Sequence, residues 1–243
     1  MKYKNEITCP SCGSLNFDYD YKCFSCKSFL REKIVNIDLG ETLLRLIDSP
    51  SEIFHKIKLA EHKNYLLLIL IFLSFRFLIL SRFISVPLTQ KSVETDIFIL
   101  VIVSLINTFS LFVLLAFISQ KALDLNKVKG RFKDILSVLT YSFVPNVFAL
   151  LILFPIELVF YGEYLFSNNP YPYQIKESVF YLLFGLEILM MIWSVFLLMT
   201  GLNEFLKSRF LSILYSIIIW FTILTALYLQ SDILFIQQKV FIK

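Results

Sequence analysis

The chain has 243 residues, 57% of them hydrophobic, and a mean hydropathy of +0.72. One soluble core could not hide that much apolar surface, so the composition excludes an ordinary soluble domain and predicts that lipid solvates the excess. The net charge of +4 does not indicate nucleic acid by itself, because the basic residues lie at helix ends and form no single stripe.

The first sixty residues lack a long apolar run but hold all four cysteines of the chain, Cys9, Cys12, Cys23 and Cys26. Two C-x-x-C pairs separated by ten residues have the spacing of a tetrahedral zinc site with four thiolate ligands. Structural disulfides are the alternative, but the charge pattern described below places this head in the reducing cytosol, where disulfides rarely persist. The cysteines therefore predict a structural Zn²⁺ site. Four protein ligands close such a site to water, so no catalysis is expected there.

The segment between the two cysteine pairs alternates apolar and polar residues, which is the period of a half-buried strand or short hairpin. The apolar members are Leu15, Phe17, Tyr19 and Tyr21. Residues 1–36 are thus predicted to form a zinc ribbon and linker, and so small a domain needs the metal in order to fold. Lys22 and Lys27 are offset by Asp18 and Asp20, so nucleic-acid binding is not expected.

Residues 37–63 carry two short amphipathic patterns. In the first, Asp38 is a helix cap, and one face holds Leu39, Leu43 and Ile47. In the second, Ser49-Pro50-Ser51-Glu52 matches a capping box, and the residues that follow on one face are Ile53, Phe54 and Ile57. This second helix either lies on the anionic inner leaflet or packs as an ordinary juxtamembrane helix, and both interpretations stay open.

Five apolar runs occupy residues 64–230, at roughly 65–84, 97–118, 135–161, 179–202 and 210–229. About 20 residues at a rise of 1.5 Å cross a hydrocarbon core of about 30 Å. The predicted fold is an all-α polytopic membrane protein with five transmembrane helices, preceded by a small four-cysteine zinc ribbon. Residues 231–243 are predicted to be a short extracytoplasmic tail.

The distribution of Lys and Arg predicts the orientation of the chain. The head before Tyr65 holds ten of these residues and the 119–134 loop holds five, whereas the connections on the other side hold few. Because positive residues accumulate on the cytoplasmic side, we expect a cytosolic amino terminus and an extracytoplasmic carboxyl terminus in the inner or plasma membrane of the cell.

A few polar residues interrupt the apolar runs. Arg76, Asn107 and Glu187 fall in one layer near the centres of three spans. A charge at that depth costs at least about 2.5 kcal/mol, so such residues usually pair inside the bundle. We hypothesise an Arg76–Glu187 ion pair bridged by Asn107, and a second pair, Arg82–Glu157, near the outer boundary. The alternative is that Arg76 snorkels and Glu187 is protonated, or that the pair serves only to lock the helix register.

The third span contains Pro145 and Pro155, which predict a kinked or broken helix. Enzyme motifs such as H-E-x-x-H and G-x-S-x-G are missing from the sequence, and six glycines leave little room for a phosphate-binding loop. The chain is therefore predicted not to be an enzyme.

Two stretches resemble the bacterial and archaeal branch of the Yip family, five-span membrane proteins related to the Ypt/Rab-interacting proteins of eukaryotes. The first is Asp48-Ser49-Pro50 with Phe54 and Ile57, and the second is Gly130-Arg131-Phe132-Lys133 leading to Leu136, Val138, Tyr141-Ser142 and Pro145. The similarity covers roughly residues 43–230. It implies a cytosolic amino terminus and a non-enzymatic role in membrane organisation, trafficking or assembly through partner proteins.

In eukaryotic relatives the cytosolic region binds small GTPases. Here the predicted ribbon occupies that region, and the Asp-Leu-Tyr-Gly-Pro segment typical of those relatives is absent. The expected partners are therefore membrane lipid and a cytosolic or membrane protein other than a small GTPase. The leading hypothesis is a membrane scaffold or adaptor that binds proteins through its cytosolic zinc ribbon. The alternative is a small transporter or permease subunit that uses Arg76 and Glu187 at the midplane.

Overall fold

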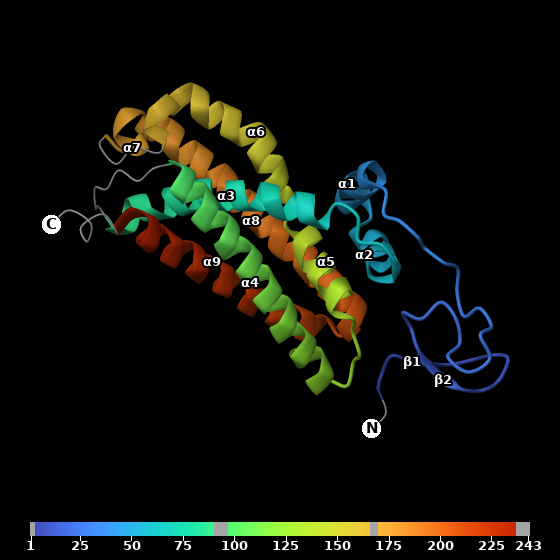
Figure 1. Cartoon of the computed structure of the whole chain (residues 1–243). Coiled ribbons are helices and arrows are strands. Elements are labelled where there is room, and N and C mark those ends of the chain that lie inside the picture. The colour runs from blue at the N-terminus through green and yellow to red at the C-terminus, as the bar shows by residue number, and fades with distance from the viewer. Residues whose placement is uncertain (1–2, 90–96, 166–169, 237–243) are drawn as a thin grey trace.

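The computed structural model describes residues 3–89, 97–165 and 170–236, with side chains described at 3–81, 98–165 and 170–231. A bundle of long helices carries a small two-stranded ribbon at one end (Figure 1). The ribbon contains β1 (Glu6–Thr8) and β2 (Leu15–Phe17), and two short helices follow, α1 (Leu39–Asp48) and α2 (Pro50–Leu59). The bundle consists of α3 (Leu66–Thr89), α4 (Ile97–Leu125), α5 (Phe132–Ser142), α6 (Val144–Tyr161), α8 (Glu177–Leu206) and α9 (Arg209–Ile236). The short elements η1 (Gly162–Leu165) and α7 (Pro172–Ile175) connect α6 to α8.

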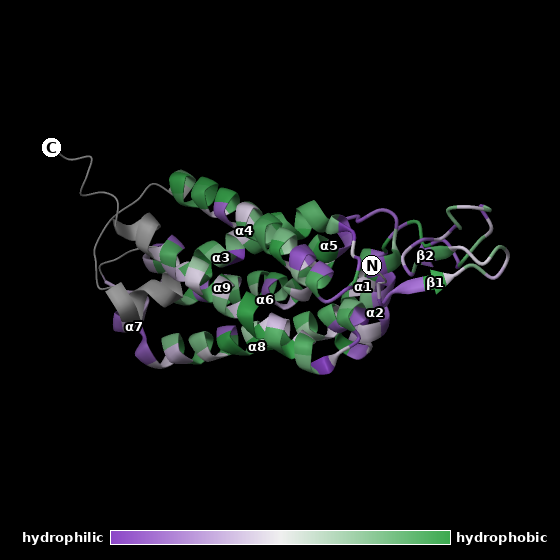
Figure 2. Ribbon diagram, turned by 90° about the horizontal axis from the view of Figure 1, so that it is seen from below, coloured by the Kyte–Doolittle hydropathy of each residue, from purple (hydrophilic) through white to green (hydrophobic). Residues whose placement is uncertain are grey.

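Four stretches of the bundle are long and apolar enough to cross a membrane: Phe98–Leu125, Phe132–Leu165, Glu177–Leu206 and Arg209–Ser231. In the first predicted span, the part with described side chains, Leu66–Ser81, is apolar but shorter, although helix α3 itself continues to Thr89. Large apolar side chains stay exposed along these helices; Val159, for example, is 83% exposed. Figure 2 shows the same division, with apolar residues along the bundle and hydrophilic ones at the end that carries the ribbon. A surface of this kind needs lipid as its solvent.

The last candidate span, Arg209–Ser231, agrees with the predicted run, but its helix is longer. Helix α9 continues beyond residue 230 to Ile236, and residues 237–243 lie outside the described part of the chain. The predicted tail therefore begins with helix.

The third span is broken, and the break falls just before the first proline. Helix α5 ends at Ser142, Phe143 leaves the helical conformation at φ −95° and ψ 11°, and α6 begins at Val144. Pro145 stands at the start of α6, where its missing N–H does not interrupt a helical hydrogen bond. Pro155, by contrast, lies inside α6 without ending it. The predicted break thus arises at one of the two prolines.

Helix α2 packs into the bundle. Ile53, Phe54 and Ile57 are at most 2% exposed, and α2 contacts both α5 and α8. The closest approach is at Gly201 of α8, where an added Cβ atom would lie 2.5 Å from Val138 Cγ1 and 3.2 Å from Phe54 Cδ1. The apolar face of α2 is therefore used for packing against the bundle, as in the juxtamembrane interpretation, and is not free to insert into the leaflet.

Gly201→Ala should destabilise the protein by about 1–3 kcal/mol, because overpacking forces side chains from their preferred conformations. The matched control is Gly185→Ala in the same helix, where an added Cβ would meet nothing within 4 Å. The control should be neutral or slightly stabilising, because alanine favours helix more than glycine does. Unfolding measured in detergent micelles checks both variants, and equal effects would contradict the close packing of α2, α5 and α8.

Candidate metal centre and intramembrane ion cluster

The two cysteine pairs form equivalent turns built on a repeated C-x-S-C-x-S sequence at 9–14 and 23–28. In the first turn, Gly13 N donates to Cys9 O at 3.0 Å; in the second, Lys27 N donates to Cys23 O at 3.1 Å. Gly13 and Lys27 both have positive φ, +73° and +62° respectively. The lysine thus adopts the backbone conformation that glycine favours, so its presence does not break the equivalence of the turns.

The antiparallel pairing of β1 with β2 brings the first turn into position, with Thr8 opposite Leu15 and Glu6 opposite Phe17. A single bridge between Lys22 and Phe29 holds the second turn in the same way. Each turn therefore presents its thiols from the closed end of a short hairpin, and the two ends face each other.

The four sulfur atoms converge. Cys9 Sγ lies 3.7 Å from Cys26 Sγ, and Cys12 Sγ lies 3.6 Å from Cys23 Sγ, with all four sulfurs within 4.8 Å of one another. A tetrahedral site with Zn–S bonds of about 2.3 Å separates its thiolates by about 3.8 Å, which matches these distances. The four cysteines can therefore hold one metal ion.

Two serines complete the centre, and the sequence reasoning missed them. Ser14 Oγ lies 3.0 Å from Cys23 Sγ and 3.1 Å from Cys12 Sγ. Ser28 Oγ lies 3.3 Å from Cys9 Sγ and 3.0 Å from Cys26 Sγ, so each hydroxyl joins the two turns.

The hydroxyls also favour the thiolate form of the buried cysteines. The hydrogen bond with Ser14 lowers the pKa of Cys23 to about 5, and that with Ser28 lowers the pKa of Cys9. Because metals bind thiolates, these serines prepare the site for a cation. The sequence signal that could have identified the two serines is the motif C-x-S-C-x-S, which occurs twice, 14 residues apart.

The ribbon docks directly on the helix bundle. Lys58 of α2 is 2% exposed and pairs with Asp18 of the ribbon at 2.6 Å, while its Nζ also donates to Glu204 O of α8 at 3.2 Å. Asn5 makes two hydrogen bonds to the backbone of Lys129, at 2.8 and 3.0 Å. These contacts fix the ribbon to α2, α8 and the loop between α4 and α5.

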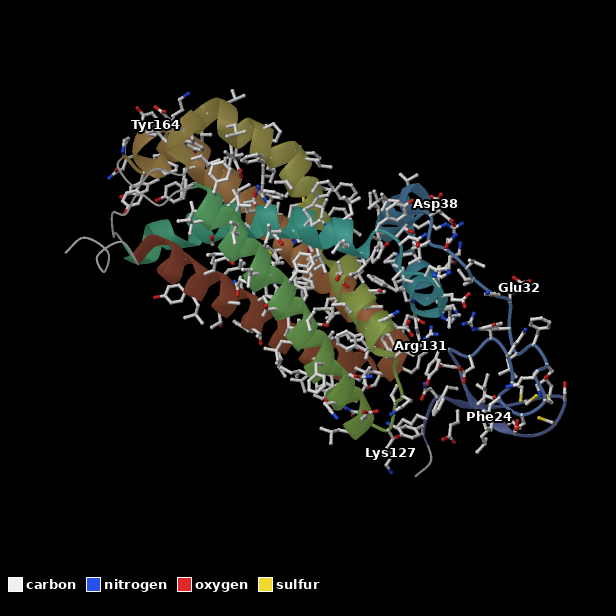
Figure 3. The ribbon with its side chains drawn as sticks, viewed as in Figure 1. Phe24, Glu32, Asp38, Lys127, Arg131 and Tyr164 are labelled. Atoms are coloured by element: carbon white, nitrogen blue, oxygen red, sulfur yellow. The ribbon has the colours of Figure 1, made fainter. Side chains whose placement is uncertain are left out.

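Arg131 is the centre of a second group of contacts at this junction. Its guanidinium lies 5.1 Å from the ring centre of Tyr19 and pairs with the buried Asp134 at 2.7 Å. Figure 3 labels Arg131 at the end of the bundle that meets the ribbon. Lys63 also pairs with Asp134, at 2.9 Å, and burial lowers the pKa of Lys63. Burial raises the pKa of Tyr19 to about 12, so its hydroxyl remains neutral in the interface.

Within the bundle, Arg76 lies between two carboxylates from other helices. Its Nη1 is 3.2 Å from Glu157 Oε2 and its Nη2 is 3.3 Å from Glu157 Oε1, and Nη2 also pairs with Glu187 Oε1. All three residues are at most 1% exposed. The contact predicted between Arg76 and Glu187 is thus present, in a cluster that joins α3, α6 and α8.

One detail of the predicted intramembrane network differs, and one lies outside the described residues. Asn107 does not bridge Arg76 and Glu187, because it faces α9, where its Nδ2 donates to Gln230 Oε1 at 2.6 Å. Equal depth in the membrane does not place residues on the same side of a bundle, and depth was all that the sequence supplied. The predicted pair of Glu157 with Arg82 stays a prediction, because the side chain of Arg82 lies outside the described residues; among those residues, Glu157 pairs with Arg76.

Comparison with known families decides the assignment of the helical part. The model of the Yip1 domain matches residues 44–230. The chain belongs to the Yip family. The Yip domain spans the end of α1 and all the bundle helices down to α9, whereas the four cysteines precede it. No curated protein and no solved structure gives a significant match. The chain is therefore a membrane protein of a non-enzymatic family, and its four-cysteine cluster lies outside the family domain.

Proposed function

We propose that this Yip-family protein is a non-enzymatic membrane scaffold whose zinc ribbon binds a protein partner on the cytosolic side. In this proposal the metal is a structural Zn²⁺ ion, because four thiolates in a closed tetrahedral set suit zinc and leave no position for water. The membrane part crosses five times, with α3 as the first crossing, and the basic residues of the head and the 119–134 loop place the amino terminus in the cytosol.

The observation that carries the proposal is the docking of the ribbon. The ion pair of the buried Lys58 with the partly exposed Asp18 and the two hydrogen bonds between Asn5 and Lys129 hold the ribbon against the Yip domain. A surface held in this way is preorganised, so a partner does not have to order it on binding, and preorganisation raises affinity. The ribbon is thus suited to present a fixed contact surface at the end of a membrane bundle.

A groove of about 330 Å³ on the ribbon is the surface we assign to the partner. It is lined by Glu6, Leu15, Asn16, Phe17, Asp20 and Phe24. Phe24 is 80% exposed and Leu15 is 57% exposed, while Glu6 and Asp20 supply carboxylates. Exposed aromatic residues are typical anchors of protein interfaces. The lining therefore suits a partner segment that offers apolar side chains beside Lys or Arg.

Phe24→Ser in the full-length protein should abolish capture of a specific partner from native membranes, because it removes the largest exposed apolar side chain of the groove. Phe29→Ser is the matched control, since Phe29 is also in the ribbon and 69% exposed but does not line the groove. Both variants must retain one metal ion per chain. If the Phe24→Ser variant captures the partner as well as the Phe29→Ser control does, the proposal is contradicted.

The transporter alternative gains no support from the comparisons. The intramembrane Arg76 cluster joins α3, α6 and α8, and we assign it to the stability of the bundle.

A further inference from the structure

Helix α1 has three distinct sides, and one of them is apolar and exposes Leu44 and Ile47, while Leu43 at its edge packs partly on the core. Leu39, Thr42 and Leu46 form the side toward the protein; Thr42 and Leu46 are 1% exposed. Glu41, Arg45 and Asp48 form a charged side. The third side holds Gly40, Leu43, Leu44 and Ile47, a spacing of three, four and seven residues that places them in one stripe. We call these four residues the α1 stripe.

The α1 stripe differs from what the sequence pattern predicts. Leu39, Leu43 and Ile47 were expected to share one apolar face of this helix, but Ile47 is exposed at 60%, and so is Leu44 at 71%. The helix turns Thr42 and Leu46 inward: Leu46 joins the core, and the buried hydroxyl of Thr42 is satisfied by donating to Asp38 O. The two largest side chains of the α1 stripe are left outside.

The contacts of α2 set the level of α1 relative to the bilayer. Phe54 packs on Gly201 and Val138, which lie inside the cytosolic ends of α8 and α5, while Lys58, one turn later, reaches Glu204. The start of α2 thus points toward the membrane centre. Helix α1 ends at Asp48, two residues before that start, and its main contacts are with α2. The end of α1 therefore lies near the boundary of the inner-leaflet hydrocarbon.

The linker before α1 places the helix beside a surface that already faces lipid. Ile34 O and Val35 O accept hydrogen bonds from Glu61 N and His62 N, so this linker runs along the approach to α3. Figure 1 shows α1 at the flank of the bundle where α3 begins. The first turn of α3 exposes Leu67 at 61% and Leu68 at 41%. The α1 stripe and these two leucines are thus apolar and exposed at the same end of the bundle.

We propose that α1 is an interfacial helix whose stripe, through Leu44 and Ile47, contacts the acyl chains of the inner leaflet. Its charged side does not favour anionic headgroups, because Glu41 is paired with Lys56 and Arg45, and Arg45 also pairs with Glu52. The binding energy comes from apolar burial, in the manner of a helix lying in the plane of the membrane surface. The partner of this surface is lipid rather than a second protein.

Tryptophan quenching in nanodiscs tests the proposal. Leu44→Trp, Ile47→Trp and the control Asp48→Trp are made in the full chain with Trp193→Phe and Trp220→Phe, in phosphatidylcholine brominated near the top of the acyl chains. We expect residues 44 and 47 to be quenched at least about twofold more strongly than residue 48, which acrylamide in the water should quench instead. Adding phosphatidylglycerol should leave this difference unchanged. If the chain with Trp193→Phe and Trp220→Phe loses its metal or aggregates, the three new tryptophans are introduced into the chain that keeps its native tryptophans. The emission of Trp193 and Trp220 is then the same in all three variants, and the same difference is measured above it.

Two results would overturn the proposal. Acrylamide quenching at 44 and 47 equal to that at 48 would place the α1 stripe in water. Protection of 44 and 47 from both quenchers would show that a protein surface, from a partner or a second copy, covers it.

Discussion

Removal of the metal should unfold the ribbon and leave the helix bundle folded. A segment of about thirty residues buries too little surface to fold alone, and in comparable peptides a structural zinc ion supplies about 10–16 kcal/mol. The buried Cys9 and Cys23 would lose the ion that holds their hairpins together. The bundle has its own core, which includes the mutually packed rings of Phe77, Phe112 and Phe143.

Hydrogen exchange before and after chelation measures this outcome segment by segment. Amides of residues 5–30 should lose protection, whereas those of α4 and α8 should keep it. Cys23→Ser should have the same effect as the chelator, and Ser25→Ala is the control in the same turn, because Ser25 is not among the converging metal ligands. An apo ribbon that kept its protection would refute a structural role for the metal.

Arg76→Leu should destabilise the bundle by about 3–5 kcal/mol, because removal of one partner from a buried ion pair leaves an uncompensated charge. Here two carboxylates, Glu157 and Glu187, would lose the cation that they share. Glu187→Gln should cost less, since Arg76 keeps its two hydrogen bonds to Glu157. Unfolding with increasing SDS in mixed micelles gives the free energies, with Arg209→Leu at the exposed start of α9 as the control.

The triple variant Arg76→Leu, Glu157→Gln and Glu187→Gln distinguishes an ion cluster from three independent residues. It removes the charges together, so most of the stability lost in Arg76→Leu should return. If the three substitutions destabilise the protein additively, the residues are not coupled and the cluster has no energetic role.

Local patterns predicted much of this protein. The length and hydropathy of the apolar runs anticipated the long helices of the bundle, and the spacing of the cysteines anticipated a four-sulfur cluster. Both signals are local, because a helix that crosses lipid must satisfy its own backbone and a C-x-x-C turn brings its own two thiols together. The break near Pro145 was predictable for the same reason.

The remaining features depend on contacts that no local pattern contains. Asp18 and Lys58 are forty residues apart, and only the packing of the ribbon on α2 brings them to 2.6 Å. Asn107 faces α9 and not Arg76, because the position of a residue along a helix does not determine its rotation about the helix axis. Ile47 matched an apolar face by spacing, yet α1 turns Leu46 inward. Pairing, rotation and docking are tertiary properties.

Carbodiimide crosslinking in native membranes tests most directly whether the ribbon is a platform fixed on the membrane bundle. This reagent joins a carboxylate to an amine only where they already touch, and it spares the thiolates that hold the metal. The account predicts an abundant amide between Asp18 and Lys58 in the metal-loaded protein, which disappears when the metal is removed. Crosslinks from Asp18 to many different lysines, or none to Lys58 while the metal is still bound, would show a ribbon that moves independently and would contradict the account.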